Sequence, residues 1–154
     1  MGLWGDDIGA VADPFKLRRF VEAQKTVYEQ ALSEIKGGRK RSHWMWFIFP
    51  QISGLGSSSM SERYSIRSSA EAEAYLSHPV LGSRLLESVE ATLKLEGLSA
   101  NEIFDYPDDL KLQSCATLFS SVVADGSVFH QLLDKYFAGD HDDETIRLII
   151  ENDR

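Results

Sequence analysis

The sequence predicts an all-α or predominantly α protein, a single compact multi-helix domain with one buried aromatic segment. Apolar residues recur at helical spacing in several separate segments. Residues that start and stop helices flank most of these segments. The chain has 154 residues, of which 43% are hydrophobic, so it is long enough for one core and too short for two comfortable ones.

The first helix is expected to start at Asp13-Pro14, an N-cap acid followed by a proline, and to stop at Gly37-Gly38. Residues 1–12 are interpreted as a loosely ordered arm, and residues 13–154 as the globular domain. Gln24 interrupts the apolar stripe of this helix. Because a buried amide needs partners, its side chain is either bonded to backbone or faces a site.

Later helices are predicted from the same signals. Capping boxes at Ser68 and Ser99, each with a glutamate three residues on, predict a short helix through Leu76 and a brief helical turn. Further helices are expected over residues 79–97, 107–123, 128–139 and 142–150. The apolar faces predict a core that contains Phe20, Tyr28, Leu32, Trp46, Phe47, Leu85, Val89, Leu118, Phe119, Val122, Phe129 and Leu133.

The most informative segment is the run from Ser42 to Ile52, which holds two of the three tryptophans and two phenylalanines. A continuous apolar run of this length is compatible with a buried strand or a short buried helix, and residues 44–49 are left open between the two. A Gly/Ser stretch follows at once, within a loop predicted over residues 53–68. If the protein has a ligand site, we expect it here.

In this site hypothesis, basic side chains balance phosphate charge, Trp44 stacks on a base or sugar, and loop backbone donates to oxygens. His43 is placed at the pocket rim, and Asp109 is the carboxylate of any catalytic step. The expected ligand-binding residues are Lys40, Arg41, Trp44, Gln51, Gly54, Gly56, Ser58 and Lys111.

Each of these features has a plainer interpretation. The basic triplet at residues 39–41 could be a solvated helix end, and His43 could be structural. The Gly/Ser stretch could be a flexible connection, since it matches neither phosphate-binding fingerprint. The acids at Asp105, Asp108 and Asp109 suit the start of a helix, where they interact with the positive end of its dipole.

Composition excludes several classes of function. The formal charge of −8 argues against a nucleic-acid polymer as partner, because that mode needs clustered Lys and Arg. Cys115 is the only cysteine, so we expect no disulfide and no thiolate metal site, and we interpret it as a buried, inert thiol. No histidine spacing suggests a metal, and we expect no cofactor. Without a signal-peptide pattern or a membrane-length apolar run, we expect a soluble cytoplasmic protein.

Several segments of the chain together form a recognisable pattern. They are Asp13-Pro14-Phe15, Arg19-Phe20, Gly38-Arg39-Lys40, Ser42 to Ile52, Gly54-Leu55-Gly56, His78-Pro79-Val80-Leu81-Gly82, Asp108 to Leu112, Thr117-Leu118-Phe119, Phe137 and Gly139. These segments resemble one bacterial family, the domain-of-unknown-function family 1810, over about residues 13–149, and the most specific part is the His-Trp-Met-Trp-Phe stretch. Members are often labelled calpastatin, but calpastatin-type inhibitors resemble disordered chains, whereas this chain predicts a stable helical core.

The order of a helix-borne Asp/Lys pair and a later Phe-x-x-Leu-Leu helix is also similar to NADAR-type N-glycosidases, which act on ADP-ribose-related and riboflavin-pathway intermediates. The leading hypothesis is a protein that binds a nucleotide or ADP-ribose-like small molecule near residues 40–59, with glycosidic-bond hydrolysis as the reaction to test first. The competing hypothesis is a non-enzymatic interaction module or homodimer that uses exposed aromatics as a protein interface.

Overall fold

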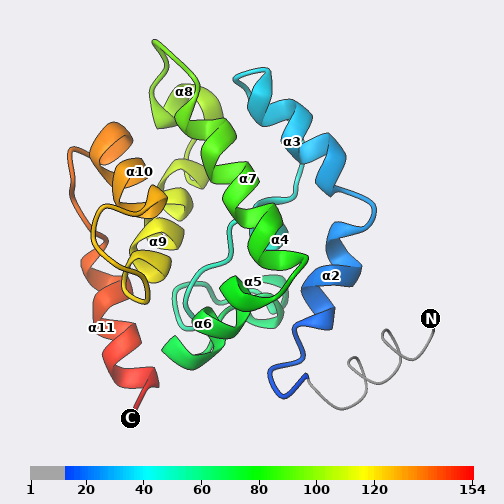
Figure 1. Cartoon of the computed structure of the whole chain (residues 1–154), viewed down its shortest axis with the longest axis vertical. Coiled ribbons are helices and arrows are strands. Elements are labelled where there is room, and N and C mark those ends of the chain that lie inside the picture. Colours follow the sequence, from blue (N-terminus) through cyan, green and yellow to red (C-terminus); the bar gives the residue numbers. More distant parts are fainter. Residues whose placement is uncertain (1–12) are drawn as a thin grey trace.

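The computed structural model describes residues 13–154, which fold as ten helices (Figure 1). Within these residues the only strand-like pairing is an isolated parallel bridge between Ile52 and Ile66. The prediction of an all-α protein is confirmed. The arm predicted at residues 1–12 lies outside the described residues.

The helices differ widely in length, from four residues to thirteen. They are α2 (Arg18–Gln24), α3 (Tyr28–Lys36), α4 (Met45–Ile48), α5 (Ser59–Arg63), α6 (Ser69–Ser77), α7 (Leu81–Leu93), α8 (Ala100–Phe104), α9 (Asp108–Ser120), α10 (Val128–Phe137) and α11 (Asp143–Asn152). None of the helices described is both long enough and apolar enough to span a bilayer.

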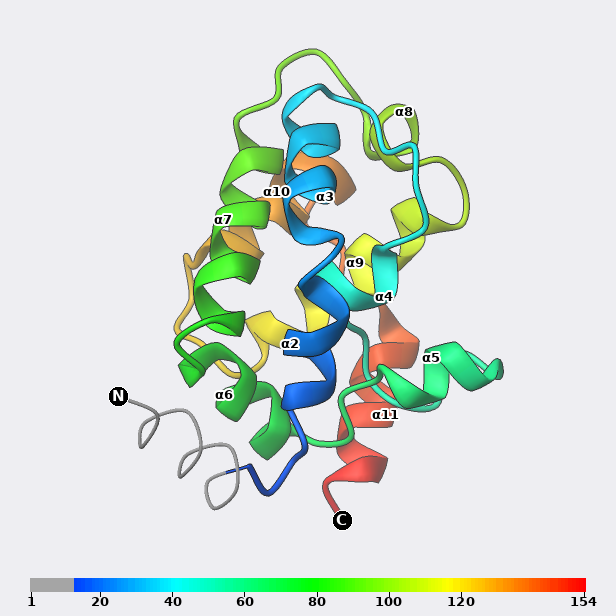
Figure 2. The ribbon, with the colours of Figure 1, turned by 90° about the vertical axis from the view of Figure 1, so that its right-hand side faces the viewer.

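Helices α7 and α9 organise the bundle. α9 packs against α6, α8, α10 and α11, and α7 packs against α3, α4, α6 and α10. Figures 1 and 2 show α9 enclosed by its neighbours. Every residue from Ser114 to Ser120 is buried, as expected for a helix surrounded on all sides.

Local capping explains where most helices start. Ser58, Ser68, Ser99, Ser127 and Asp142 each accept a backbone N–H from the third residue of the helix that follows. At Ser99 the reciprocal bond from the Ser99 backbone N–H to the side chain of the third helical residue is also present, so the predicted capping box is confirmed.

The single helix predicted between Asp13-Pro14 and Gly37-Gly38 is wrong, because the segment forms two helices, α2 and α3. Asp13 does accept the backbone N–H groups of Leu17 and Arg18, but Lys16 has φ 55°, outside the helical region, so α2 begins only at Arg18. Residues 25–27 then form a turn that includes two β-branched residues, which are weak helix formers.

Gln24 lies at the end of α2, where its side chain is 1% exposed. Its amide nitrogen donates to the carbonyl of Phe47 and to the hydroxyl of Tyr75, and its oxygen accepts from Arg84. Of the two interpretations of Gln24, the one that bonds the amide to backbone is therefore correct.

The long loop predicted over residues 53–68 is also corrected, because it contains the short helix α5. Gly54 has φ 110°, and a side chain there would meet Leu148 at 2.9 Å. The Gly/Ser stretch is thus fitted against α11 at this point, and Ser58 serves as the N-cap of α5. The sequence could not predict α5, because this five-residue helix has no buried residue and therefore no apolar periodicity.

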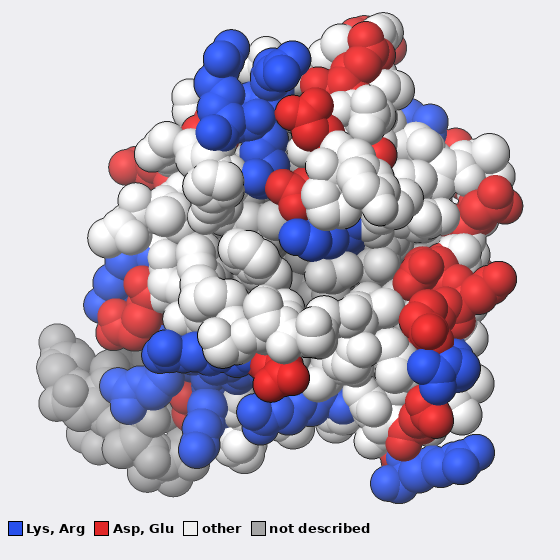
Figure 3. Space-filling model, turned by 180° about the vertical axis from the view of Figure 1, so that it is seen from behind, with Lys and Arg blue, Asp and Glu red and all other residues white. Residues whose placement is uncertain are grey.

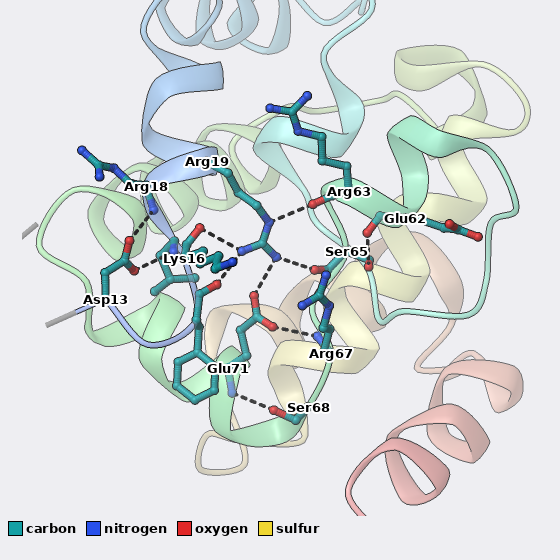
Figure 4. A network of polar contacts seen from close by, with 12 residues as sticks. Asp13, Lys16, Arg18, Arg19, Glu62, Arg63, Ser65, Arg67, Ser68 and Glu71 are labelled. Carbon is teal, nitrogen blue, oxygen red and sulfur yellow. Dashed lines mark hydrogen bonds and ion pairs between the residues drawn. The ribbon is translucent and has the colours of Figure 1, made fainter. Parts of the chain in front are cut away.

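The ion pair between Arg19 of α2 and Glu71 of α6 joins two residues that lie 52 positions apart in sequence. The Arg19 guanidinium also donates to the carbonyls of Phe15, Lys16, Arg63 and Ser65 (Figure 4). The second oxygen of Glu71 accepts the backbone N–H of Arg67. The pair thereby fixes both ends of the α5–α6 connection to α2.

The predicted core is largely confirmed. Phe20, Leu85, Val89, Leu118, Phe119, Phe129 and Leu133 are each at most 1% exposed. Tyr28, Leu32, Phe47 and Val122 are partly buried against the same cluster. Trp46 is the exception, because it is partly buried without packing against this cluster, and Trp44 fills the core in its place at 1% exposure.

Candidate functional site

The segment from Arg39 to Trp44 leaves the end of α3 and crosses to α8. Gly38 makes the turn with φ 80°, a backbone conformation that glycine adopts without strain. The Lys40 N–H then donates to the carbonyl of Ile103 in α8 at 2.7 Å. This bond brings residues 40–44 beside the connection between α8 and α9, as Figure 2 shows.

Glu34 holds this segment from the α3 side. Its carboxylate accepts the backbone N–H groups of Arg41 and Ser42 at 2.7 and 3.0 Å, the Ser42 hydroxyl, the indole N–H of Trp44 at 2.8 Å and the amide of Gln30 at 3.1 Å. Burial by itself would raise the pKa of Glu34, but the hydrogen bonds from these groups outweigh it and lower that pKa to about 2.

Replacing Glu34 with glutamine is expected to lower the free energy of unfolding by about 1–2 kcal/mol at pH 7. Since the folded pKa is about 2 and the ordinary value is 4.5, the carboxylate stabilises the fold above pH 4.5. That contribution is lost as the pH falls from 4.5 to about 2. Urea denaturation across this range should show the difference between the wild type and E34Q shrinking, whereas E90Q, at an exposed position, should differ little at any pH.

The aromatic run is helical between Met45 and Ile48, which answers the question left open for residues 44–49. Helical phase puts Trp44, Met45, Ile48 and Phe49 on the buried face. Trp46, two residues beyond Trp44, lies about 200° away around a helix axis and faces outward. Because every residue from Trp44 to Phe49 is apolar, the sequence does not indicate which face of the helix is buried, and it could not distinguish the two tryptophans.

The opposite wall comes from the connection between α8 and α9. Asp105 ends α8 with φ 60°, and the Tyr106–Pro107 peptide bond is cis. α9 then begins at Asp108, which places Asp108 and Lys111 one helical turn apart on the same face.

Between these two walls lies a cavity of about 340 Å³, here called the cleft. One side is lined by Lys40, Arg41, Ser42, His43, Met45 and Trp46. The other side is lined by Phe104, Asp105, Tyr106, Pro107, Asp108 and Lys111. Figure 3 shows this face, where Lys and Arg side chains lie next to Asp and Glu side chains around a hollow.

The charged groups of the cleft are closely arranged. Asp108 binds the ammonium groups of Lys40 at 2.8 Å and of Lys111 at 3.2 Å. The Lys40 side chain is 8% exposed, and its ammonium also lies 5.1 Å from the Trp44 ring centre. The Lys111 ammonium lies 4.8 Å from the ring centre of Trp46. The lining carries two lysines and one arginine against two aspartates, on a protein whose formal charge is −8.

The structure brings some predicted site residues together and separates others. Lys40, Arg41, His43 and Lys111 all line the cleft. Trp44 does not, because its ring is buried and its indole N–H is bonded to Glu34.

Asp109 also lies outside the cleft lining, and it accepts from Asn101 and from the backbone N–H of Leu110. Four further predicted residues are absent from the lining, namely Gln51, Gly54, Gly56 and Ser58. Gln51 instead accepts the backbone N–H of Ile66 through its carbonyl.

Sequence reasoning missed Trp46 as a side chain of the cleft lining, and Asp105 and Asp108 as its carboxylates. The spacing of Asp108 and Lys111 was a usable signal, since residues three apart on a helix are neighbours. No comparable signal existed for Tyr106, because its position depends on the turn between α8 and α9.

A second hollow, of about 680 Å³, lies at the α10–α11 turn. Its lining includes Asp140, His141 and Asp143, which are surface residues of an acidic turn. Within residues 13–154, no group of three or more His, Cys, Asp or Glu side chains is placed to hold a metal ion. Burial raises the pKa of the Cys115 thiol, so this group has the character of a buried, inert thiol.

Comparisons with known proteins identify a family and a similar solved structure. A family model described as a protein of unknown function (DUF1810) matches residues 14–149. The chain is also similar to the crystal structure of the conserved hypothetical protein Rv1873 from Mycobacterium tuberculosis, with 49% sequence identity and a TM-score of 0.88. That similarity covers 90% of this chain and 99% of the other. No curated protein matches the chain.

Proposed function

The chain belongs to the DUF1810 family of proteins of unknown function, and from the chemistry of its cleft we propose that it binds a small nucleotide-like anion there. The observation that carries the proposal is the joint presence of basic side chains and an accessible indole in one cavity. Lys40, Arg41 and Lys111 supply the positive charge, and Trp46 supplies a flat apolar surface.

The size and charge of the cleft support this class of ligand. Small-molecule sites have volumes of about 300–1,000 Å³, and the cleft, at about 340 Å³, is at the lower end. A ligand of mononucleotide size therefore suits it better than a long dinucleotide. Phosphate oxygens find ammonium and guanidinium donors there, and a base or sugar finds the ring of Trp46.

Glycosidic-bond hydrolysis is the reaction we would test first at this site. In such a step water attacks the anomeric carbon and the bond from that carbon to the base breaks. The base leaves with the bonding electron pair and takes up one proton of the water, whose hydroxyl stays on the sugar. Asp105 and Asp108 are the two carboxylates in the cleft lining, so one of them would stabilise the positive charge on the sugar, in place of Asp109, which the sequence named as the carboxylate of any catalytic step.

The competing proposal is a protein interface beside the cleft, formed by a second copy of this chain. It is favoured by Tyr106 and Leu110, which are 74% and 48% exposed. The two proposals predict different behaviour of the purified protein, because ligand binding raises its thermal stability and dimerisation makes that stability depend on protein concentration.

A thermal-shift screen with nucleoside monophosphates tests the proposed function. A ligand at about 100 times its Kd stabilises the folded state by about 2.7 kcal/mol, which is a readily measured rise in Tm. Lys111→Ala should abolish most of the rise, whereas Lys25→Ala, a control at an exposed ion pair on α2, should leave it unchanged. A stable dimer that shows no shift with any nucleotide would favour the interface instead.

His43→Ala is expected to weaken binding while lowering the free energy of unfolding by less than about 1 kcal/mol. The side chain is exposed and lines the cleft, so its loss creates no cavity in the core. Titration calorimetry and urea denaturation of the same preparation provide the two measurements. A large stability loss with unchanged binding would assign His43 to the fold rather than to the site.

A further inference from the structure

The two lysines of the cleft share one carboxylate. Lys40 contacts one oxygen of Asp108 at 2.8 Å, and Lys111 contacts the other oxygen at 3.2 Å. All three side chains are at most 24% exposed, so water screens this arrangement only in part. Asp108 thus lies between two ammonium groups that come from opposite walls of the cleft.

Both lysines are held in place by groups other than Asp108. The Lys40 ammonium also donates to the carbonyl of Ser42 and lies against the Trp44 ring. The Lys111 ammonium lies against the ring of Trp46. Because these contacts do not involve Asp108, the two ammonium groups would stay directed at the same point if its carboxylate were moved or neutralised.

Three backbone N–H groups at the start of α9 are already bonded within the turn. The N–H groups of Asp109, Leu110 and Lys111 already donate to the carbonyls of Asp105 and Pro107. The two lysines are the cationic groups that face an anion at the place of the Asp108 carboxylate.

We infer that Asp108 competes with the phosphate group of the ligand for Lys40 and Lys111, and that the bound phosphate occupies the place of the Asp108 carboxylate. This inference rests on the proposed function. It assigns the phosphate to the two lysines and the base or sugar to Trp46, and it makes Asp108 a restraint on affinity. A phosphate beside an ionised Asp108 would be repelled by it at short range in a partly buried site.

Removing the charge of Asp108 is therefore expected to raise the affinity of the cleft for phosphate-bearing ligands. Asp108→Asn keeps the shape of the side chain but removes its charge, so adenosine 5′-monophosphate should bind about tenfold more tightly than to the wild type. Inorganic phosphate should gain in the same way. Adenosine, which has no phosphate, should gain nothing.

The matched control is Asp109→Asn, which removes the same charge from the next residue of α9, outside the cleft lining. Titration calorimetry of the wild type, D108N and D109N with the three probes gives the comparison, and far-UV circular dichroism verifies that each variant is folded. Asp108→Ser, which also removes the charge but keeps a side chain suited to a helix start, takes the place of D108N if that variant does not fold.

Tighter binding of both phosphate-bearing probes to D108N, but not to D109N, supports the inference. Weaker binding to D108N, with measurable binding to the wild type, overturns the inference and leaves the proposed function in place, since Asp108 would then position the lysines. Equal gains in D108N and D109N also overturn it, because they reflect net charge alone. No binding of any probe to any of the proteins overturns the proposed function itself.

Discussion

Gly82→Ala is expected to destabilise the protein by about 3 kcal/mol or more. A Cβ at residue 82 would lie 2.1 Å from the carbonyl oxygen of Leu76 and 2.9 Å from its carbonyl carbon. Both atoms belong to the backbone of α6, so no side chain can turn away to relieve the overlap. The connection between α6 and α7 would have to open, and α7 contacts four of the helices that surround it.

Urea denaturation with a far-UV circular dichroism signal measures this effect. Gly37→Ala is the matched control, because the nearest atom to a Cβ there is 3.4 Å away, an ordinary contact. Its φ of −79° is also compatible with alanine. We expect G37A to change stability by no more than about 0.5 kcal/mol. A G82A variant with the wild-type midpoint would show that α6 and α7 are not in this close contact.

Arg19→Met is expected to cost about 3–5 kcal/mol, because it leaves a buried carboxylate without its partner. Glu71 is 2% exposed and makes its ion pair with Arg19 at 2.8 Å. The substitution also removes the guanidinium donors from four backbone carbonyls, those of Phe15, Lys16, Arg63 and Ser65. Arg19→Lys should restore little of the lost stability, since one ammonium group cannot donate hydrogen bonds to so many fixed acceptors.

A double-mutant cycle measures the interaction energy between Arg19 and Glu71 separately from their contacts with other groups. Arg19→Met combined with Glu71→Gln should cost less than the sum of the two single variants, because no buried charge is left unpaired. Lys25→Met, in an exposed pair with Glu22, should cost no more than about 1 kcal/mol. Additive single effects would mean that Arg19 and Glu71 stabilise the fold independently.

The start of α6 shows which contacts can be predicted from a sequence and which cannot. The cap at Ser68 was recognisable, because an N-cap bond joins residues only three apart. Glu71 was expected to complete that capping box, but its side chain is bonded to Arg19 and to the Arg67 backbone instead. Arg19 is 52 residues away, so no local pattern could indicate this partner.

The residues of the cleft also differ in whether the sequence could predict them. Lys40, Arg41 and His43 were predicted together because they are adjacent in the chain and lead into the aromatic run. Lys111 was also named, yet its position opposite Lys40 depends on the bond between the Lys40 backbone and Ile103. The Gly/Ser stretch follows the run directly in sequence, but Gly54 packs against Leu148 of α11 and not against the cleft.

The sequence by itself determined the helical class, most helix starts and the basic entry to the aromatic run, because capping and periodic burial act within a few residues. Only the tertiary structure decided which tryptophan is buried and which aspartate enters the cleft. Trp44 and Trp46 are equally apolar, and Asp108 and Asp109 are the same residue type. Their roles depend on the rotation of α4 and α9 about their own axes, and that rotation is set by packing against helices distant in the chain.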